Sequence, residues 1–418
     1  MAMLPPKDRE QRASEQIRTA RVRRTPAGFA VTLTALAILF VVFYAFVLKP
    51  PPSVTTPALA SATGRFVSTE QQVRDGIAVS TTTRGSFVLS GDGDAAVEAV
   101  VVNDGLNFES AGDHRWAYDA AARQELHVFK PTEGRPRATL VTDQWPPRWR
   151  VGGPTPVDFQ GDAAIVRSAV EDGDRTIGIK PVLYLDREAW RASWRSGAWQ
   201  KDLIVDRETG LVVWYSLEGT DGDGGDVEYR VEGLRLDEPA PAGAFDTTPP
   251  AGVRVERSAS GDPQIVGGLD EAAERVGVAL PSSTLDPDGY ELVAVGVTQI
   301  ATAPAVWVAP RASGRAEGPY PGEAAPNAAV LLYAKGLSSY TIEIVTGRRR
   351  TTPIDPGWND LFGHLTVDLQ YGVFAGRTAQ TWYGDGPAAV VWNDDYVVRV
   401  SGGLTRTEAI SILEGLEL

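Results

Sequence analysis

Short runs of alternating apolar and polar residues dominate the chain from Phe66 to about Val255. Runs such as AVEAVVVN, HRWAYD and LVVWYS are bounded by Gly and Asp clusters. Successive side chains of a strand point to opposite faces, so this alternation predicts an antiparallel sheet with one buried face. Only residues 68–79 are expected to form a helix, with Ser68 as its cap and Gln71 three residues on.

The stretch VDRETGLVVWY, residues 205–215, places three charges between two apolar runs. Asp206 can accept hydrogen bonds from turn amides, and Gly210 can adopt a positive φ, so a hairpin turn explains every residue. The alternative, a catalytic carboxylate pair, would need a cleft and a partner base. The acidic stretch at 220–226 is similarly expected to be a solvated hairpin tip, because its spacing does not fit a calcium-binding EF-hand.

Past residue 264 the pattern changes to a short amphipathic helix, four to six strands and a closing helix. Thr405 is expected to cap the closing helix, with Glu408 completing a capping box. This region is predicted to be a compact α+β domain. Residues 309–327 and 346–363, the latter including three arginines at 348–350, are expected to be surface loops.

Residues 27–48 are uncharged and long enough to cross a membrane as a single helix. Seven of the eight basic residues among the first 50 precede this segment. The positive-inside rule then places the N-terminus in the cytoplasm and residues 49–418 outside a bacterial cytoplasmic membrane. The alternative is a cleaved signal peptide with the small residues at 58–61 as its cleavage site, although the apolar run is longer than such peptides use.

Composition narrows the chemistry of the remainder. Residues 51–418 hold 32 basic and 51 acidic residues, a net charge of −19, which disfavours nucleic-acid binding. Cysteine is absent, so disulfides and thiolate chemistry are excluded. His114, His127 and His364 are scattered without metal-ligand spacing, and no nucleophile or phosphate-binding motif occurs. We therefore expect neither a metal site, nor a cofactor, nor an enzymatic activity.

One constellation stands out as a candidate contact site, DREAWRASWRSGAW at 186–199. On a helical turn Trp190 and Trp194 would share a face, with Arg187, Arg191 and Arg195 repeating at the same interval. Aromatic rings beside guanidinium groups suit the edge of a lipid-binding cavity or a membrane surface. The favoured alternative is that the tryptophans seal a hydrophobic core while the arginines are solvated.

The motifs GDHRWAYDAAARQELHVF, LIVDRETGLVVWYSLEG and the closing AFDTTPPAGVRV follow one another in order. In this series residues 66–256 resemble the lipoprotein-carrier superfamily of the Lol type, and within it the MucB/RseB regulators of envelope-stress sigma factors. The resemblance implies a curved antiparallel half-barrel wrapped on a helix and enclosing an apolar cavity for acyl chains or a hydrophobic peptide. A tethered chain departs from the soluble carriers, which favours sensing or holding over shuttling.

The C-terminal region resembles a small domain found in sigma-factor regulatory and sporulation-associated membrane proteins. LDEAAERVG, LPSSTLDPDGYEL, VLLYAKGLSSYTI and VVWNDDYVVRVSGGLTRTEAISILEGL carry this resemblance. The predicted fold class is thus a single transmembrane helix followed by an α+β ectodomain. Its predicted parts are a basic cytoplasmic tail (1–26), a transmembrane helix (27–48), a Pro/Thr/Ala-rich stalk (49–64), a half-barrel (65–257) and a small α+β domain (265–418).

Three functions are compatible with this organisation. The leading hypothesis is a membrane-anchored extracytoplasmic protein that binds a lipid, lipoprotein or hydrophobic peptide. It would modulate sigma-factor signalling through a partner such as a membrane-bound anti-sigma protein. The second is an envelope-assembly or cell-wall scaffold that does not signal. The third is a hydrolase that uses two carboxylates, which would require a concave site holding both acids.

Overall fold

A computed structural model describes most of the chain beyond residue 58. The described residues are 59–418, except 75–76, 104–110, 146–154, 174–175, 197–198, 220–224, 260–262, 284–288, 299–326, 347–364, 384–386, 394 and 418. Residues 54–418 form one compact unit. The predicted tail, the transmembrane helix and residues 49–58 of the predicted stalk lie outside the described residues.

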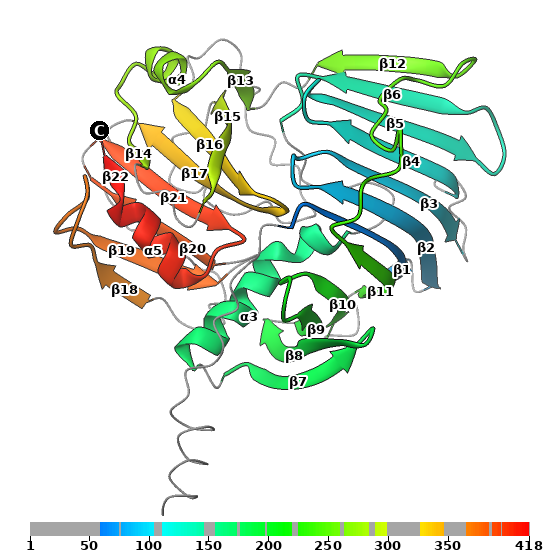
Figure 1. Ribbon diagram of the computed structural model, residues 1–418, viewed down its shortest axis with the longest axis horizontal. Coiled ribbons are helices and arrows are strands. Elements are labelled where there is room, and N and C mark those ends of the chain that lie inside the picture. The colour runs from blue at the N-terminus through cyan, green and yellow to red at the C-terminus, as the bar shows by residue number, and fades with distance from the viewer. Residues whose placement is uncertain are drawn as a thin grey trace, which may run out of the picture. The chain divides into compact units, whose positions relative to one another are not determined.

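The first part of the described chain is a twelve-stranded sheet (Figure 1) with the strand order β12-β6-β5-β4-β3-β2-β1-β11-β10-β9-β8-β7. Neighbouring strands are antiparallel apart from the parallel pair of β6 and β12. The strands are β1 (Ser61–Arg74), β2 (Ile77–Ser90), β3 (Ala95–Asn103), β4 (Gly112–Asp119), β5 (Gln124–Pro131), β6 (Arg137–Thr142), β7 (Gly178–Tyr184), β8 (Arg187–Ser196), β9 (Trp199–Asp206), β10 (Val212–Gly219), β11 (Asp226–Leu236) and β12 (Arg254–Ala259).

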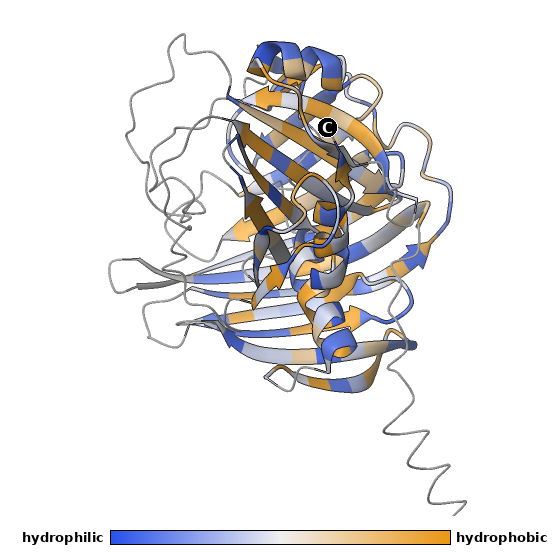
Figure 2. Cartoon of the chain, turned by 90° about the vertical axis from the view of Figure 1, so that its left-hand side faces the viewer, coloured by the Kyte–Doolittle hydropathy of each residue, from blue (hydrophilic) through white to orange (hydrophobic). Residues whose placement is uncertain are grey.

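Alternating hydropathy explains how these strands bury one face (Figure 2). In β2, Phe87 and Leu89 are buried, and on β4 Trp116 and Tyr118 are buried at the same spacing of two. Their side chains join one hydrophobic cluster with Phe66 of β1. The antiparallel sheet predicted from the alternation is therefore present.

The prediction of a helix over residues 68–79 is wrong. Ser68 to Arg74 belong to β1, and Ile77 to Val79 belong to β2. Gln71, the expected helix-capping partner, is paired with Ser80 on one side and Asp226 on the other. Strand pairing on both sides of β1 satisfies its backbone groups, and this tertiary gain overrides a weak local helix signal.

A helical element that the sequence analysis did not anticipate lies between β6 and β7. It consists of the 3-10 turn η3 (Pro156–Phe159) and the helix α3 (Gln160–Asp172). Gly173 ends the helix in the left-handed conformation, with φ of 67°. We call the twelve-stranded sheet together with η3 and α3 the N-terminal module.

The rest of the described chain, which we call the C-terminal module, holds an eight-stranded sheet with the order β13-β15-β16-β17-β21-β20-β19-β18 and a small pair β14-β22. Its elements are β13 (Gln264–Val266), α4 (Leu269–Val276), β14 (Ser282–Ser283), β15 (Glu291–Thr298), β16 (Ala328–Lys335), β17 (Ser338–Thr346), β18 (Leu365–Asp368), β19 (Thr378–Tyr383), β20 (Pro387–Trp392), β21 (Tyr396–Gly402), α5 (Arg406–Glu414) and β22 (Leu416–Glu417).

The closing helix α5 forms as its sequence predicts. Thr405 accepts a hydrogen bond from the Glu408 amide at 3.3 Å, and the Glu408 carboxylate accepts one from the Thr405 amide at 2.6 Å. This reciprocal pair is the expected capping box. Ala409, Ile412 and Leu413 are buried against the sheet. The sheet is larger than the four to six strands expected, with eight strands among the described residues.

The predicted fold class, a transmembrane helix with an α+β ectodomain, is wrong. The described residues are mostly β-sheet, and their only α-helices are the short α3, α4 and α5. Within this described part, no helix is both long and apolar enough to cross a membrane. The described residues are rich in β-strands because almost every apolar run among them is paired into a sheet. The few helices pack against these sheets.

We predict that Gly85→Ala destabilises the N-terminal module, whereas Gly178→Ala does not. A Cβ on Gly85 would lie 2.4 Å from the Glu98 carbonyl oxygen and 2.9 Å from a carbon of the Phe66 ring, while on Gly178 the nearest contact would be 3.6 Å. Overpacking of this kind costs roughly 1–3 kcal/mol. Urea unfolding of the two variants measures the difference, and equal free energies of unfolding would contradict the tight packing of β2 against β3.

Candidate functional site

Five strands of the first sheet, β7 to β11, curve until their outer members meet, and we call these five strands the curl. β10 is paired with β11 only at Trp214–Leu217. Beyond that pairing, the Tyr184 hydroxyl on β7 donates a hydrogen bond of 3.2 Å to the Val231 carbonyl on β11. These two strands are four positions apart in the sheet order. The hydrogen bond therefore links the two edges of the curl.

η3 and α3 cover the inner face of the curl. The Phe159 ring lies 4.5 Å from the Tyr215 ring and 5.2 Å from the Tyr229 ring, measured between centroids. Asp162 of α3 accepts a hydrogen bond of 2.9 Å from Lys201 of β9. The inner face of the curl thus lies between strands β9, β10 and β11 on one side and the helical element of η3 and α3 on the other.

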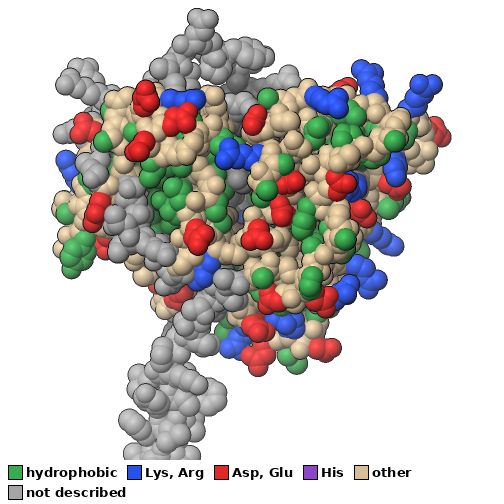
Figure 3. Space-filling view, turned by 45° about the horizontal axis from the view of Figure 1, so that its top comes forward, with side chains coloured by type: hydrophobic (Ala, Val, Ile, Leu, Met, Phe, Trp, Pro, Cys, Tyr) green, Lys and Arg blue, Asp and Glu red, His purple; other side chains and the backbone are tan. Residues whose placement is uncertain are grey.

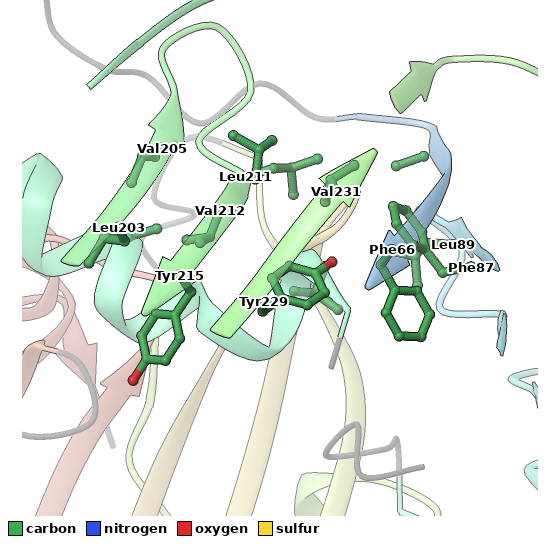
Figure 4. Close-up of a cluster of buried hydrophobic side chains, with 14 of the residues drawn as sticks. Phe66, Phe87, Leu89, Leu203, Val205, Leu211, Val212, Tyr215, Tyr229 and Val231 are labelled. Carbon is green, nitrogen blue, oxygen red and sulfur yellow. The ribbon is translucent and has the colours of Figure 1, made fainter. Parts of the chain in front are cut away.

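Apolar and aromatic side chains line this inner face (Figure 4). Leu203, Val205, Val212 and Val231 are buried there with at most 2% exposure. Ala192 of β8 is also fully buried, and its side chain is smaller than those of these leucine and valine residues. Such a lining provides no solvation for a charged group and suits a hydrocarbon chain.

Three hydrogen-bond donors are buried in this apolar lining without a partner among the described residues. They are the indole Nε1 of Trp190, the indole Nε1 of Trp194 and the hydroxyl of Tyr229. Tyr229 is fully buried, and Trp194 is 4% exposed. Burial raises the pKa of Tyr229 well above its ordinary value, so its hydroxyl stays protonated. The site therefore offers neutral donors in a low-dielectric environment.

Asp158 of η3 adds a titratable group near the Tyr229 hydroxyl. Its carboxylate accepts a hydrogen bond of 2.5 Å from the Thr155 amide. Burial raises the pKa of Asp158 from 3.8 to about 8, and the hydrogen bonds from Thr155 oppose this rise. The nearby carboxyl in turn contributes to the raised pKa of Tyr229. At neutral pH the carboxyl of Asp158 is mostly uncharged.

The hairpin predicted at residues 206–210 is confirmed. Asp206 is 1% exposed, and one of its carboxylate oxygens accepts hydrogen bonds from the amides of Glu208 and Thr209, at 3.1 and 2.8 Å. Gly210 has a φ of 70°. Arg187 donates to the other oxygen at 2.5 Å, and this hydrogen bond raises the pKa of the guanidinium. The charges of this segment hold the turn that joins β9 to β10.

The five residues predicted to form one contact site are divided between two faces, because they lie on strand β8 and not on a helical turn. Trp190 and Trp194 belong to the inner face with the core. Arg187 and Arg191 pair on the outer face with Asp206 and Asp202, and Arg195 is exposed. Contact of these residues with a ligand or membrane stays a prediction.

Cations still reach the tryptophan rings, but they come from other positions. Arg207 of the hairpin turn lies 4.5 Å from the centre of the Trp190 ring, and Lys201 lies 6.0 Å from that of Trp194. Each cation is also paired with an acid, Arg207 with Glu188 and Lys201 with Asp162. The two cations at the border of the inner face are therefore neutralised by ion pairs.

The histidines have other partners where they are described. His114 stacks on Phe129 with centroids 4.4 Å apart, and His127 contacts Glu125 at 2.7 Å. His364 lies outside the described residues, as do the three arginines at 348–350 and most of the acidic stretch at 220–226. Across the described ranges, no group of three or more His, Asp or Glu residues is arranged to hold a metal ion.

The sequence analysis missed Asp158, Tyr184 and Tyr229 as site residues. A signal for η3 and α3 was present, since Thr155 is followed by Pro156 at the first helical position and by Asp158 at the third. No comparable signal exists for Tyr184 or Tyr229. Each is one aromatic residue in an alternating strand, and only the curvature of the sheet brings the Tyr184 hydroxyl to β11, the strand that carries Tyr229.

Some solved structures are similar to this chain at low sequence identity. No family model matches the chain, and no curated protein matches it either. Solved structures with similarity include the MucA/MucB complex of Pseudomonas aeruginosa (13% identity, 86% of this chain, 95% of that chain, TM-score 0.27) and a crystal structure of MucB (14%, 88%, 94%, 0.21). A LolA-superfamily protein of Nitrosomonas europaea is also similar (10%, 47%, 94%, 0.21).

These structures belong to the families that the sequence resemblance names. TM-scores of 0.21 to 0.27 are too low to transfer a ligand or partner. The likeness therefore carries no argument about this chain, and its function has to be argued from the site.

We predict that Asp158→Asn changes the pH dependence of stability. The folded-state pKa of about 8 lies above the ordinary 3.8, so the aspartate favours folding at low pH and loses that contribution as the pH rises to about 8. Across this pH window the free energy of unfolding of the variant should rise relative to that of the natural chain, by at most about 1.4 kcal/mol per pH unit. Because Asp158 remains partly exposed, solvent screening should make the slope smaller.

Denaturant unfolding at a series of pH values measures this difference. Asp113→Asn, at an exposed position of β4, is the matched control. A difference between the natural chain and Asp158→Asn that stays constant with pH would show that the carboxyl is solvated in the folded state.

Proposed function

We propose that this chain is a non-enzymatic binding protein that holds a hydrophobic ligand against the inner face of the curl, beneath η3 and α3. The observation that carries the proposal is the set of unpaired donors on Trp190, Trp194 and Tyr229. The ligand would carry a hydrogen-bond acceptor on an apolar chain, as an acyl compound does.

The energetic argument concerns the cost of leaving buried donors unpaired. A buried polar group without a partner costs about 1–3 kcal/mol, and native proteins contain few of them. Phenylalanine at position 229 would fill the same space without a hydroxyl. Three unpaired donors close to one apolar lining are therefore better explained by a ligand that supplies acceptors than by folding alone.

The lining also limits what the ligand can be. Lys201 and Arg207, the cations beside the tryptophan rings, are paired with acids, and Asp158 would repel an anion whenever it ionises. The site thus favours a neutral acceptor, such as a carbonyl, over a strongly anionic group. On the face of the molecule that Figure 3 displays, basic and acidic side chains are interspersed.

A regulatory role through a protein partner is the finer part of this proposal. It is supported by the sequence resemblance to MucB/RseB regulators, and the partner would be a membrane-bound anti-sigma protein or another envelope protein. The C-terminal module would be the natural place for such a contact, since the ligand site lies wholly in the N-terminal module.

Tyr229→Phe tests the proposed role of the donors. Removing an unpaired buried hydroxyl should raise the free energy of unfolding of the unliganded protein by about 1 kcal/mol. The same change should weaken binding of dansylated undecanoic acid methyl ester severalfold, because one acceptor contact is lost. Fluorescence titration of the full-length protein and urea unfolding measure the two effects.

Tyr118→Phe is the matched control for this substitution, since Tyr118 is buried in the same cluster but donates to the Gln144 carbonyl at 3.5 Å. Its hydroxyl is used in the fold, so its removal should not stabilise the protein. Loss of stability in Tyr229→Phe without any loss of probe affinity would assign the hydroxyl a structural role and contradict the proposal.

Ala192→Leu tests the position of the site. The larger side chain would occupy space at the inner face between Trp190 and Trp194, so we expect loss of probe binding together with a destabilisation of roughly 1–3 kcal/mol. Ala122→Leu, at an exposed turn between β4 and β5, should bind the probe like the natural chain. Unchanged binding by folded Ala192→Leu would place the ligand elsewhere.

A further inference from the structure

The middle of helix α3 is buried on every side although it contains charged and polar residues. Eight consecutive residues, Asp162 to Ala169, are buried, and they include Asp162, Arg167 and Ser168. A surface helix buries one stripe only, so burial around the whole circumference requires a covering body on each side. α3 therefore lies between two parts of the molecule.

One side of α3 faces the curl. Ala163, Ile165, Val166 and Ala169 belong to the hydrophobic cluster of the N-terminal module. Asp162 on the same side forms the ion pair with Lys201 of β9. This is the side that covers the proposed ligand site.

The opposite side of α3 faces the C-terminal module through polar contacts. Gln160, Arg167, Ser168 and Asp172 follow a helical spacing that aligns them along one side. Arg167 is 4% exposed, donates to the Gly403 carbonyl and lies 3.9 Å from the Glu408 carboxylate. We call these four residues and their partners the latch.

The remaining latch contacts reach the start of α5 and the turn between β16 and β17. Ser168 accepts a hydrogen bond of 3.1 Å from the Arg406 amide, and Asp172 lies 3.6 Å from the Arg406 guanidinium. Gln160 donates to the Leu337 carbonyl and accepts from the Ser339 amide at 3.3 Å. Two separate segments of the C-terminal module thus hold α3.

Apolar packing strengthens the same contact. Leu337 of the C-terminal module packs against the hydrophobic cluster of the N-terminal module. A Cβ on Gly403 would lie 3.1 Å from the Gln160 amide oxygen and 3.2 Å from the Ser338 hydroxyl, so the backbone approaches the latch closely. The latch residues are therefore closely packed as well as hydrogen-bonded.

We propose that η3 and α3 are the lid of the ligand site and that the C-terminal module holds this lid closed through the latch. This inference rests on the proposed function, since it assigns a regulation to the same site. A ligand would reach the inner face when α3 or η3 moves away from the curl. A partner that displaces the start of α5 or the β16–β17 turn would free the lid and open the site.

The physical basis is that α3 cannot move without breaking the contacts of the buried Arg167 side chain with Gly403 and Glu408. Removing one partner of a buried, hydrogen-bonded charge costs several kcal/mol, which makes the closed arrangement a discrete state. Coupling between two sites is reciprocal, so ligand binding under α3 must also loosen α5 if loosening α5 admits ligand. The inference has two independent readouts, one without ligand and one with it.

The first readout is hydrogen exchange of the full-length protein without any ligand. In Arg167→Met and in Gln160→Leu, amides of α3 and of the first turn of α5 should exchange faster together, since each helix restrains the other. Arg275→Met is the matched control, because Arg275 pairs with Glu271 on α4 at 2.6 Å and lies outside the latch. Faster exchange in α3 alone, or in neither helix, would overturn the latch.

The second readout is the association rate of dansylated undecanoic acid methyl ester in stopped-flow fluorescence. Both latch variants should bind roughly tenfold faster than the natural chain, equivalent to about 1.4 kcal/mol, whereas Arg275→Met should bind at the natural rate. Equal rates in all four proteins would refute the lid. If no protein binds the probe, the proposed function fails, and the exchange experiment still decides whether the latch couples the two helices.

Discussion

One helix, α3, has to satisfy two different surfaces at once, and the rest of the structure depends on this constraint. Its apolar side completes the core of the curl, while its polar side is held by the C-terminal module. A helix with charged residues buried on one side would be unstable alone, since each buried polar group needs a partner. The C-terminal module supplies those partners, so the two modules are linked through the element that covers the proposed ligand site.

The curl shows how a sheet of ordinary strands becomes a site. Strands twist, and a long sheet therefore curves until distant strands approach. Here the approach is completed by the Tyr184 hydroxyl at the point where β10 is no longer paired with β11. Curvature brings Trp190, Trp194 and Tyr229 to one lining, although β8 and β11 are three positions apart in the sheet order. Apolar enclosure and unpaired donors are thus two results of the same geometry.

Most charged residues in and around the curl stabilise the fold through ion pairs and hydrogen bonds. Asp206 holds the β9–β10 turn, Arg187 neutralises it, and Arg207 covers the Trp190 ring. The exception is Asp158, whose carboxyl accepts from a backbone amide but has no cationic partner among the residues that account for its raised pKa. A group of this kind makes the site sensitive to pH near neutrality, because ionisation would place a charge beside apolar side chains.

The sequence by itself determined the features that depend on neighbouring residues: the strand alternation, the turn at Asp206–Gly210 and the capping box of α5. Each of these is a local interaction within a few residues. Tertiary structure decided that residues 68–79 are strand, that the arginines and tryptophans of β8 lie on opposite faces, and that α3 is buried between two modules. Pairing partners, sheet curvature and the covering of a helix depend on residues far away in the chain, so no local pattern could specify them.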